Sequence, residues 1–169
     1  MRGFTHEPPS GGPVDWYTPP EIFEKLKINF DLDVAYPKDK SLDWIPAKKH
    51  LTIEDDSLNC RWEGNVWMNP PYDRKIHLWL KKLSEHKNGI ALIWARTDVA
   101  WFHDYAKFAD YVLFTKNRIS FINQDMKRME RPAIGSLFLA FGRDNSLMLQ
   151  RSGLGLGFYN EGGNIWTVD

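Results

Sequence analysis

Asn69, Pro70, Pro71 and Tyr72 form the segment of this sequence best suited to do chemistry. The Asn69 side-chain oxygen and the Pro70 carbonyl are two hydrogen-bond acceptors that together could accept from both N–H groups of a planar amine. Such an amine is a poor nucleophile because its lone pair is delocalised into the ring. Two preorganised acceptors would leave that lone pair directed at an incoming methyl group. The predicted chemistry is therefore methyl transfer to an aromatic amine.

The two prolines and the tyrosine support this interpretation. Consecutive prolines fix φ and keep the preceding residues out of the helical region, so the acceptors of Asn69 and Pro70 are held in place. Tyr72 offers a flat ring on which an extruded nucleic-acid base could stack, and we expect the ring to matter rather than the hydroxyl. The alternative is a rigid surface turn, which is a common use of Asn and Pro.

The neighbouring pattern predicts where this segment lies. Residues 66–68 form an apolar run typical of a buried strand, and apolar residues after Pro71 recur at i, i+3, i+4 and i+7, as in an amphipathic helix: Ile76, Trp79, Leu80 and Leu83. The segment therefore follows a strand and precedes a helix. In open α/β sheets, ligands bind at the carboxyl ends of strands.

Further strands and helices alternate along the chain. The pattern predicts strands near residues 30–35, 89–95, 111–114 and 136–141, and a less distinct one at 51–53. A helix begins with Thr18 as N-cap, Pro19 in the first helical position and Glu21 closing a capping box. This alternation predicts an α/β sheet with helices on both faces.

Composition limits the class of protein. The 169 residues suit one catalytic domain over residues 16–169, after a Pro- and Gly-rich, flexible lead-in at 1–15. The net charge is +0, so any nucleic-acid contact requires a local patch. Cys60 is the only cysteine and the five histidines show no ligand spacing, so we expect no metal site. No apolar run approaches the roughly 20 residues of a membrane span, and we expect a cytoplasmic protein.

Basic residues cluster between the last two predicted strands. Phe121 and Met126 lie among them, and such a loop fits a clamp on the DNA backbone with a wedge for base extrusion; the basic residues are Arg118, Lys127, Arg128 and Arg131. The alternative is a solvated loop. Arg96 follows a central strand, where it could line the substrate cleft or cap the next helix.

Three carboxylates are candidate ligand groups. Asp31 and Asp33 lie on the first predicted strand, and carboxylates suit ribose hydroxyls and ammonium groups. Asp56 lies in an acidic turn. Each could instead be a solvated surface acid.

Several segments together resemble the amino-methyltransferases, and more closely the small phage-type DNA adenine methyltransferases (the phage Dam family). The similarity runs from about Trp16 to Gly142. It is carried by Asp15-Trp16-Tyr17-Thr18-Pro19, Phe30-Asp31-Leu32-Asp33-Val34-Ala35, Asp56-Ser57-Leu58 with Trp62, Asn65-Val66-Trp67-Met68-Asn69-Pro70-Pro71-Tyr72, and Ala95-Arg96-Thr97-Asp98 with Trp101-Phe102-His103.

The resemblance implies a class I, Rossmann-like methyltransferase fold with a mostly parallel sheet, S-adenosylmethionine as methyl donor, and the N6 amine of adenine in DNA as acceptor. It also implies that Thr18 and Pro19 bind the amino-acid end of the cofactor, that the Asp31/Asp33 segment forms the first cofactor turn, and that Asp56 faces the adenosine. The glycine-rich turn usual in this fold class is replaced by Tyr36-Pro37-Lys38.

A phage or prophage that marks its DNA against restriction would be a natural setting. Two alternatives stay open. One is methylation of another planar amine, such as cytosine N4, RNA adenine or a protein glutamine. The other is a catalytically silent DNA-binding or anti-restriction protein with the same fold.

Overall fold

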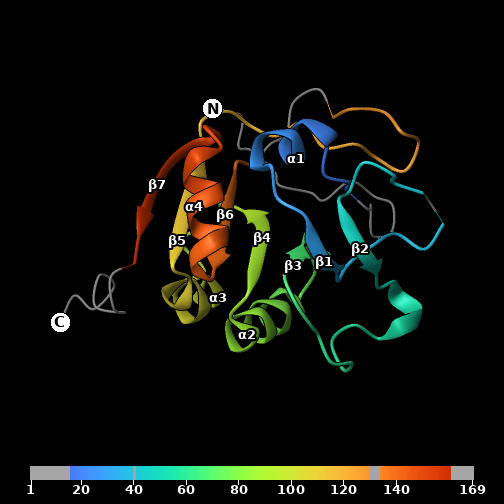
Figure 1. The fold of residues 1–169 in the computed structure, drawn as a ribbon, viewed down its shortest axis with the longest axis horizontal. Coiled ribbons are helices and arrows are strands. Elements are labelled where there is room, and N and C mark those ends of the chain that lie inside the picture. Colours follow the sequence, from blue (N-terminus) through green and yellow to red (C-terminus); the bar gives the residue numbers. More distant parts are fainter. Residues whose placement is uncertain (1–15, 40, 130–133, 161–169) are drawn as a thin grey trace, which may run out of the picture.

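The computed structural model describes residues 16–39, 41–129 and 134–160, and these form helices packed on one sheet (Figure 1). The predicted lead-in at 1–15 lies outside them. The strands are β1 (Phe30–Asp33), β2 (Ala47–His50), β3 (Val66–Met68), β4 (Gly89–Trp94), β5 (Tyr111–Thr115), β6 (Ser136–Phe141) and β7 (Gly155–Tyr159). The α-helices are α1 (Pro20–Leu26), α2 (Ile76–His86), α3 (Ala100–Tyr105) and α4 (Arg143–Arg151), and the 3-10 helices are η1 (Ile53–Asp55) and η2 (Ala106–Phe108).

The sheet is mixed, with strand order β2-β1-β3-β4-β6-β5-β7. The pairs β2–β1, β1–β3 and β3–β4 are parallel, whereas β6 runs antiparallel to both β4 and β5, and β7 runs antiparallel to β5. The expectation of a mostly parallel sheet is therefore wrong, because half of the pairings among the described residues are antiparallel. After β5 the chain makes a long connection and returns in the opposite direction, which places β6 between β4 and β5.

Two apolar clusters cover the two faces of the sheet. Ile90 and Leu92 of β4 belong to the cluster that includes residues of α1 and α4, and Ala91 and Ile93 belong to the one that includes residues of α2 and α3. Alternate residues of β4 are thus buried on opposite faces, as expected for a central strand between two helical layers. The prediction of an α/β sheet with helices on both faces is confirmed.

The start of α1 differs from the expected one. Pro20 is the first helical residue and Pro19 is the N-cap, and no side chain caps the helix. Thr18 therefore lies outside the helix, and the predicted capping box with Glu21 is wrong. A proline at the first helical position costs no hydrogen bond, because that N–H has no intrahelical acceptor.

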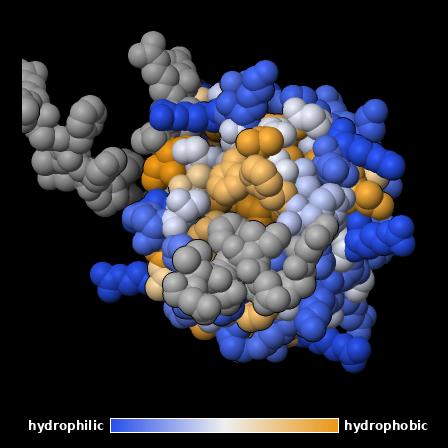
Figure 2. Space-filling view, turned by 90° about the vertical axis from the view of Figure 1, so that its left-hand side faces the viewer, coloured by the Kyte–Doolittle hydropathy of each residue, from blue (hydrophilic) through white to orange (hydrophobic). Residues whose placement is uncertain are grey.

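Other elements were not expected from the sequence. The predicted strand at 51–53 is wrong: the strand is Ala47–His50, and residue 53 already belongs to η1. The pattern also did not indicate α4 or β7. The Leu156 and Phe158 side chains of β7 and the nearby helical residue Phe108 are exposed. Figure 2, which shows the side of the molecule where β7 lies, has an apolar patch at its centre with hydrophilic side chains around it.

Among the described residues, no helix combines the length and apolar character needed to cross a membrane.

Candidate active site

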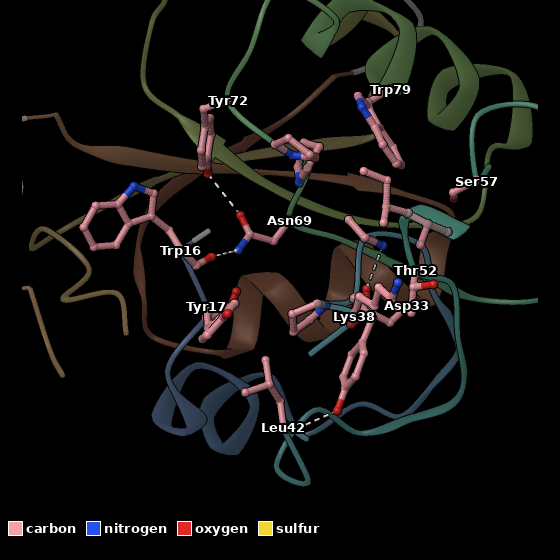
Figure 3. A pocket seen from close by; sticks show the side chains of 18 of the residues that line it. Trp16, Tyr17, Asp33, Lys38, Leu42, Thr52, Ser57, Asn69, Tyr72 and Trp79 are labelled. Carbon is pink, nitrogen blue, oxygen red and sulfur yellow. Dashed lines mark hydrogen bonds between the residues drawn. The ribbon is translucent and has the colours of Figure 1, made fainter. Parts of the chain in front are cut away.

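A cavity of about 1100 Å³ opens at the carboxyl ends of β1, β3 and β4. Residues at the ends of these strands or directly after them line it, including Val34, Asn69 and Trp94. Figure 3 shows side chains from separate parts of the chain converging on this space. Predicted site residues that line it are Thr18, Asp33, Asp56, Asn69, Pro70, Pro71 and Tyr72. The fold thus brings the predicted methyl-transfer segment and three of the five predicted cofactor residues to one cavity.

The Asn69 side chain is fixed by two hydrogen bonds (Figure 3). Its Nδ2 donates to the main-chain carbonyl of Trp16 at 2.7 Å, and its Oδ1 lies 3.2 Å from the Tyr72 hydroxyl, which donates to it. The Tyr72 hydroxyl also lies 3.3 Å from the carbonyl of Leu92. These two hydrogen bonds fix the orientation of the amide, because its nitrogen faces an acceptor and its oxygen faces a donor. One lone pair of Oδ1 accepts from Tyr72, and the second is available to another donor.

The Tyr72 ring packs flat against Trp94. The two ring centroids lie 4.1 Å apart with an interplanar angle of 2°. Burial raises the pKa of the Tyr72 hydroxyl well above its usual range, so this group stays protonated and remains a donor. Trp94 closes one face of the ring. The sequence did not single out Trp94, because it ends an apolar strand and there resembles any other core residue.

Asp33 lies almost fully buried, at 2% exposure, where β1 meets the cavity. Its Oδ1 accepts from the Ala35 N–H at 3.1 Å, and its Oδ2 lies 3.8 Å from Nδ1 of His50. Burial raises the pKa of this carboxyl, although His50 and the Ala35 N–H act in the opposite direction. The Asp33 carboxylate is thus buried, with His50 as an ion-pair partner at the long distance of 3.8 Å.

The hydroxyl of Thr18 is buried at the cavity without a hydrogen-bond partner in the described part of the chain. The residue is 1% exposed and lines the cavity, yet Oγ1 has no hydrogen-bond partner among the described residues. Most buried hydroxyls are paired, so an unpaired one at a cavity indicates a group that a ligand can satisfy.

Asp56 is exposed and lies in a turn at the rim of the cavity. It has a left-handed backbone with φ of 46°, and its Oδ2 accepts from Nδ2 of Asn59 at 2.8 Å. The next residue, Ser57, is buried and also lines the cavity. The sequence identified the acidic turn but not the serine.

Pro19 and Asp31 do not line the cavity. Asp31 accepts from the Asn65 N–H at 2.8 Å and from the Lys48 ammonium at 2.7 Å, and both interactions lower the pKa of its carboxyl. Asp31 and Asp33 share a strand but have different surroundings: Asp31 pairs with Lys48 and Asn65, whereas Asp33 ends β1 and lines the cavity. Asp31 holds β1 to its neighbours instead.

Of the residues predicted to bind DNA, the four that the structure describes do not line the cavity. Arg128 forms a two-pronged ion pair with Glu21 of α1, with N–O distances of 2.5 and 2.9 Å. Arg96 lies 3.6 Å from a carboxylate oxygen of Asp98. Arg118 and Lys127 are exposed, and Arg131 lies outside the described residues.

Of the two apolar residues predicted to act as a wedge for base extrusion, Phe121 is excluded by the structure and Met126 is not. Phe121 is buried at 3% exposure and belongs to the core cluster beside α1, so it is not available as a wedge. Met126 is 47% exposed and has a left-handed backbone with φ of 62° in a turn next to the cavity residues Gln124 and Asp125.

Sequence reasoning missed several aromatic lining residues, of which Trp16 and Trp79 are examples. Trp79 was expected only on the buried face of a helix, and periodicity does not distinguish a core position from the wall of a cavity. Within the described ranges, no group of three or more His, Cys, Asp or Glu side chains is placed to hold a metal ion.

Two comparisons with known proteins give the same family description. The family model described as DNA N-6-adenine-methyltransferase (Dam) matches residues 12–144, a range that includes every lining residue named above. A protein named DNA N-6-adenine-methyltransferase, from Haemophilus phage HP1 (strain HP1c1), is 28% identical over 120 residues, which cover 65% of this chain and 67% of that protein. No solved structure matches. The chain therefore belongs to the DNA N-6-adenine-methyltransferase (Dam) family.

Proposed function

We propose that this protein transfers a methyl group from S-adenosylmethionine to the N6 amine of an adenine extruded from DNA. One observation carries the proposal: Asn69, with its amide orientation fixed, lies on the same cavity as the unpaired Thr18 hydroxyl and the buried Asp33 carboxylate. An acceptor for the substrate amine and groups for a second ligand would thus share one space.

The chain's own residues would activate the amine. Asn69 Oδ1 and the Pro70 carbonyl would each accept one N–H, so that the nitrogen lone pair points into the cavity. When bound, S-adenosylmethionine supplies an electrophilic methyl group whose sulfur leaves as a neutral thioether. The new N–C bond forms as the C–S bond breaks, and the amine then releases one proton to solvent. Because the leaving group is neutral, the site requires no strong general base.

The residues of the cavity fit the cofactor. Thr18 Oγ1 would gain its missing hydrogen bond from the amino-acid end, and the Asp33 carboxylate would face the cationic ammonium group. Asp56 would accept from the hydroxyls of the adenosine ribose. Asp31 is already engaged by Asn65 and Lys48, so we assign it to the structure of β1.

Base extrusion would use the aromatic pair. The target adenine would stack on the face of Tyr72 that Trp94 does not cover, since every base has a π-face and stacking contributes about 1–3 kcal/mol. The exposed basic residues Arg96, Arg118 and Lys127 would contact phosphates. Arg128 would act mainly through its ion pair with Glu21, which ties the connection after β5 to α1.

The strand directions support a class I methyltransferase fold. β1 to β5 share one direction, and only β6 and β7 among the described strands are reversed, with β6 inserted between β4 and β5. The setting that we propose is the cytoplasm, where the protein would mark phage or prophage DNA against restriction; the phage origin of the relative supports the phage part of this setting.

The test is to incubate the purified protein with DNA and isotopically labelled S-adenosylmethionine, hydrolyse the DNA, and identify the labelled nucleoside by mass spectrometry. We expect N6-methyladenine. Label on cytosine, or on added RNA or protein but not on DNA, would reassign the substrate. The absence of label from all of them would favour a silent DNA-binding protein.

A further inference from the structure

A lysine of α2 holds the turn that carries Asp56 and Ser57. The Lys82 ammonium donates to the main-chain carbonyls of Ser57 and Leu58, each at 2.9 Å, and to that of Cys60. It also lies 4.7 Å from the centroid of the Trp62 ring. The Lys82 ammonium is therefore in contact with three carbonyls and one aromatic face. The ammonium of an ordinary surface lysine is surrounded by water instead.

Trp62 supports the same turn. Its Nε1 donates to the Ser57 carbonyl at 2.9 Å and lies 3.3 Å from Ser57 Oγ. The Ser57 carbonyl thus accepts from two side chains that come from different parts of the chain. Within the turn, the N–H groups of Asn59 and Cys60 donate to the Asp56 carbonyl. The turn is held by hydrogen bonds between its own residues and by hydrogen bonds from Lys82 and Trp62, although it contains no regular strand or long helix.

The position of Lys82 links this turn to the methyl-transfer segment. α2 begins at Ile76, shortly after Tyr72, and Lys82 lies farther along the same helix. Trp79, between them, lines the cavity. One rigid helix therefore follows the substrate segment and holds the turn on the other side of the space. Partial burial lowers the pKa of Lys82, which shows that this placement costs solvation that its acceptors must offset.

We propose that Lys82 is a positioning residue that fixes residues 56–60 so that Asp56 and Ser57 face bound S-adenosylmethionine. This inference rests on the proposed function of the cavity. Lys82 itself does not line the cavity, so it would act through the turn and not through contact with the cofactor.

The test compares Lys82→Met with Lys81→Met. Lys81 is the preceding residue of the same helix, but it is exposed and pairs with Glu85, so it controls for the loss of one positive charge from α2. We expect Lys82→Met to raise the Kd for S-adenosylmethionine, measured by calorimetry, about tenfold or more, as removal of charged hydrogen bonds does. The kcat at saturating cofactor should change much less. Lys81→Met should match the wild type in both.

Amide hydrogen exchange provides a readout that needs no ligand. We expect Asn59 and Cys60 to exchange faster in Lys82→Met than in Lys81→Met, because the turn is held less firmly. Lys82→Gln, which keeps an amide NH2 group as a donor without the charge, should be intermediate in both measurements, and it replaces Lys82→Met if that variant does not fold.

Wild-type affinity together with wild-type exchange in the Lys82 variants would overturn the inference. Faster exchange with unchanged affinity would also overturn it, because the turn would then not position cofactor groups. If the wild-type protein itself bound no S-adenosylmethionine, the proposed function would fail, and with it the positioning role; the exchange data would then report only a structural clamp.

Discussion

Two parts of the cavity differ in how their polar groups are satisfied. In the proposed catalytic segment, Asn69 to Tyr72, the side-chain amide and the hydroxyl already have partners: Asn69 bonds to Trp16 and Tyr72. In the proposed cofactor pair, Thr18 and Asp33, the hydroxyl has no partner among the described residues, and the buried carboxylate lies 3.8 Å from His50 Nδ1. The first part is complete before a ligand arrives, and the second is not.

The difference follows from what each part would do. An acceptor that activates an amine must be oriented beforehand, since reorienting it during the reaction would cost part of the barrier reduction. A ligand-binding group can instead remain unsatisfied. A buried unpaired polar group costs about 1–3 kcal/mol, and a ligand that pairs it recovers that free energy as affinity. Variants of the catalytic segment should therefore change kcat, and variants of the cofactor pair should change Kd.

The largest effect is expected for Asn69→Ala. Loss of one preorganised electrostatic partner should lower the methylation rate about a hundredfold or more. The melting temperature should stay close to that of the wild type, because the residue is only half-buried. Asn29→Ala, at an exposed position that does not line the cavity, is the control. Turnover by Asn69→Ala at the rate of this control would remove the segment from the mechanism.

Asp33→Asn tests the cofactor pair. Removing the negative charge should raise the Kd for S-adenosylmethionine about tenfold to a hundredfold, because hydrogen bonds to charged groups are among the strong ones. Asp31→Asn on the same strand is the matched control, and it should leave the Kd nearly unchanged. Equal effects of the two substitutions would mean that β1 acts only as a structural element.

The raised pKa of Asp33 also predicts a pH dependence. Only the ionised carboxylate attracts the ammonium of the cofactor, so affinity should fall as the pH decreases through this raised pKa, above the usual range near 4. The stability of the free protein should change in the opposite direction and rise as the pH decreases. The folded-state pKa exceeds the unfolded one, so protonation in this window favours the folded state. Calorimetry and thermal melts across pH test both signs, and Asp33→Asn should show neither response.

Substitutions of Tyr72 separate its hydroxyl from its ring. Tyr72→Phe loses the hydrogen bond to Asn69, so we expect kcat to fall several-fold, by an amount typical of one neutral hydrogen bond. The sequence alone predicted no role for this hydroxyl. Tyr72→Ala also loses the stacking surface and should be slower still.

A mismatch opposite the target adenine separates the two effects further. It lowers the cost of extrusion and should partly rescue Tyr72→Ala but not Tyr72→Phe. Methylation rates on matched and mismatched duplexes measure this. Rescue of both variants to the same degree would show that the hydroxyl, too, acts in extrusion and not through Asn69.

The sequence predicted the apolar elements well and the polar ones poorly. β3, β4 and β6 are apolar runs, and α2 has clear helical spacing, so the position of Asn69 could be inferred. β2 contains Lys48, Lys49 and His50 and lies at an edge of the sheet, where burial imposes no pattern. In α4, Asn145 and Ser146 are among the buried residues, so its periodicity is hidden.

Long-range relations could not be read from the sequence either. The reversed direction of β6 depends on how the long connection after β5 folds, and local residues do not encode that direction. Arg128 pairs with a carboxylate 107 residues away, so a basic residue in an apparent DNA-binding loop became part of an internal ion pair. The difference between Asp31 and Asp33 is likewise tertiary, because it depends on Lys48 and Asn65.

The smallest and most selective effect is expected for Thr18→Val. Valine has nearly the shape of threonine, and the hydroxyl it removes is buried and unpaired, so the free protein should become more stable. For a chain of this size, each kcal/mol corresponds to a rise in Tm of about 2–4 °C. The same substitution removes a group that the cofactor would pair, so the Kd for S-adenosylmethionine should rise several-fold. Thr115→Val is the control, because its hydroxyl donates to the Ser136 carbonyl at 2.9 Å away from the cavity; its Tm should fall and its Kd should not change. Thermal melts and calorimetry on both variants decide the matter: a lower Tm for Thr18→Val would mean that the hydroxyl is paired in the free protein, and the contrast between the two parts of the cavity would no longer hold.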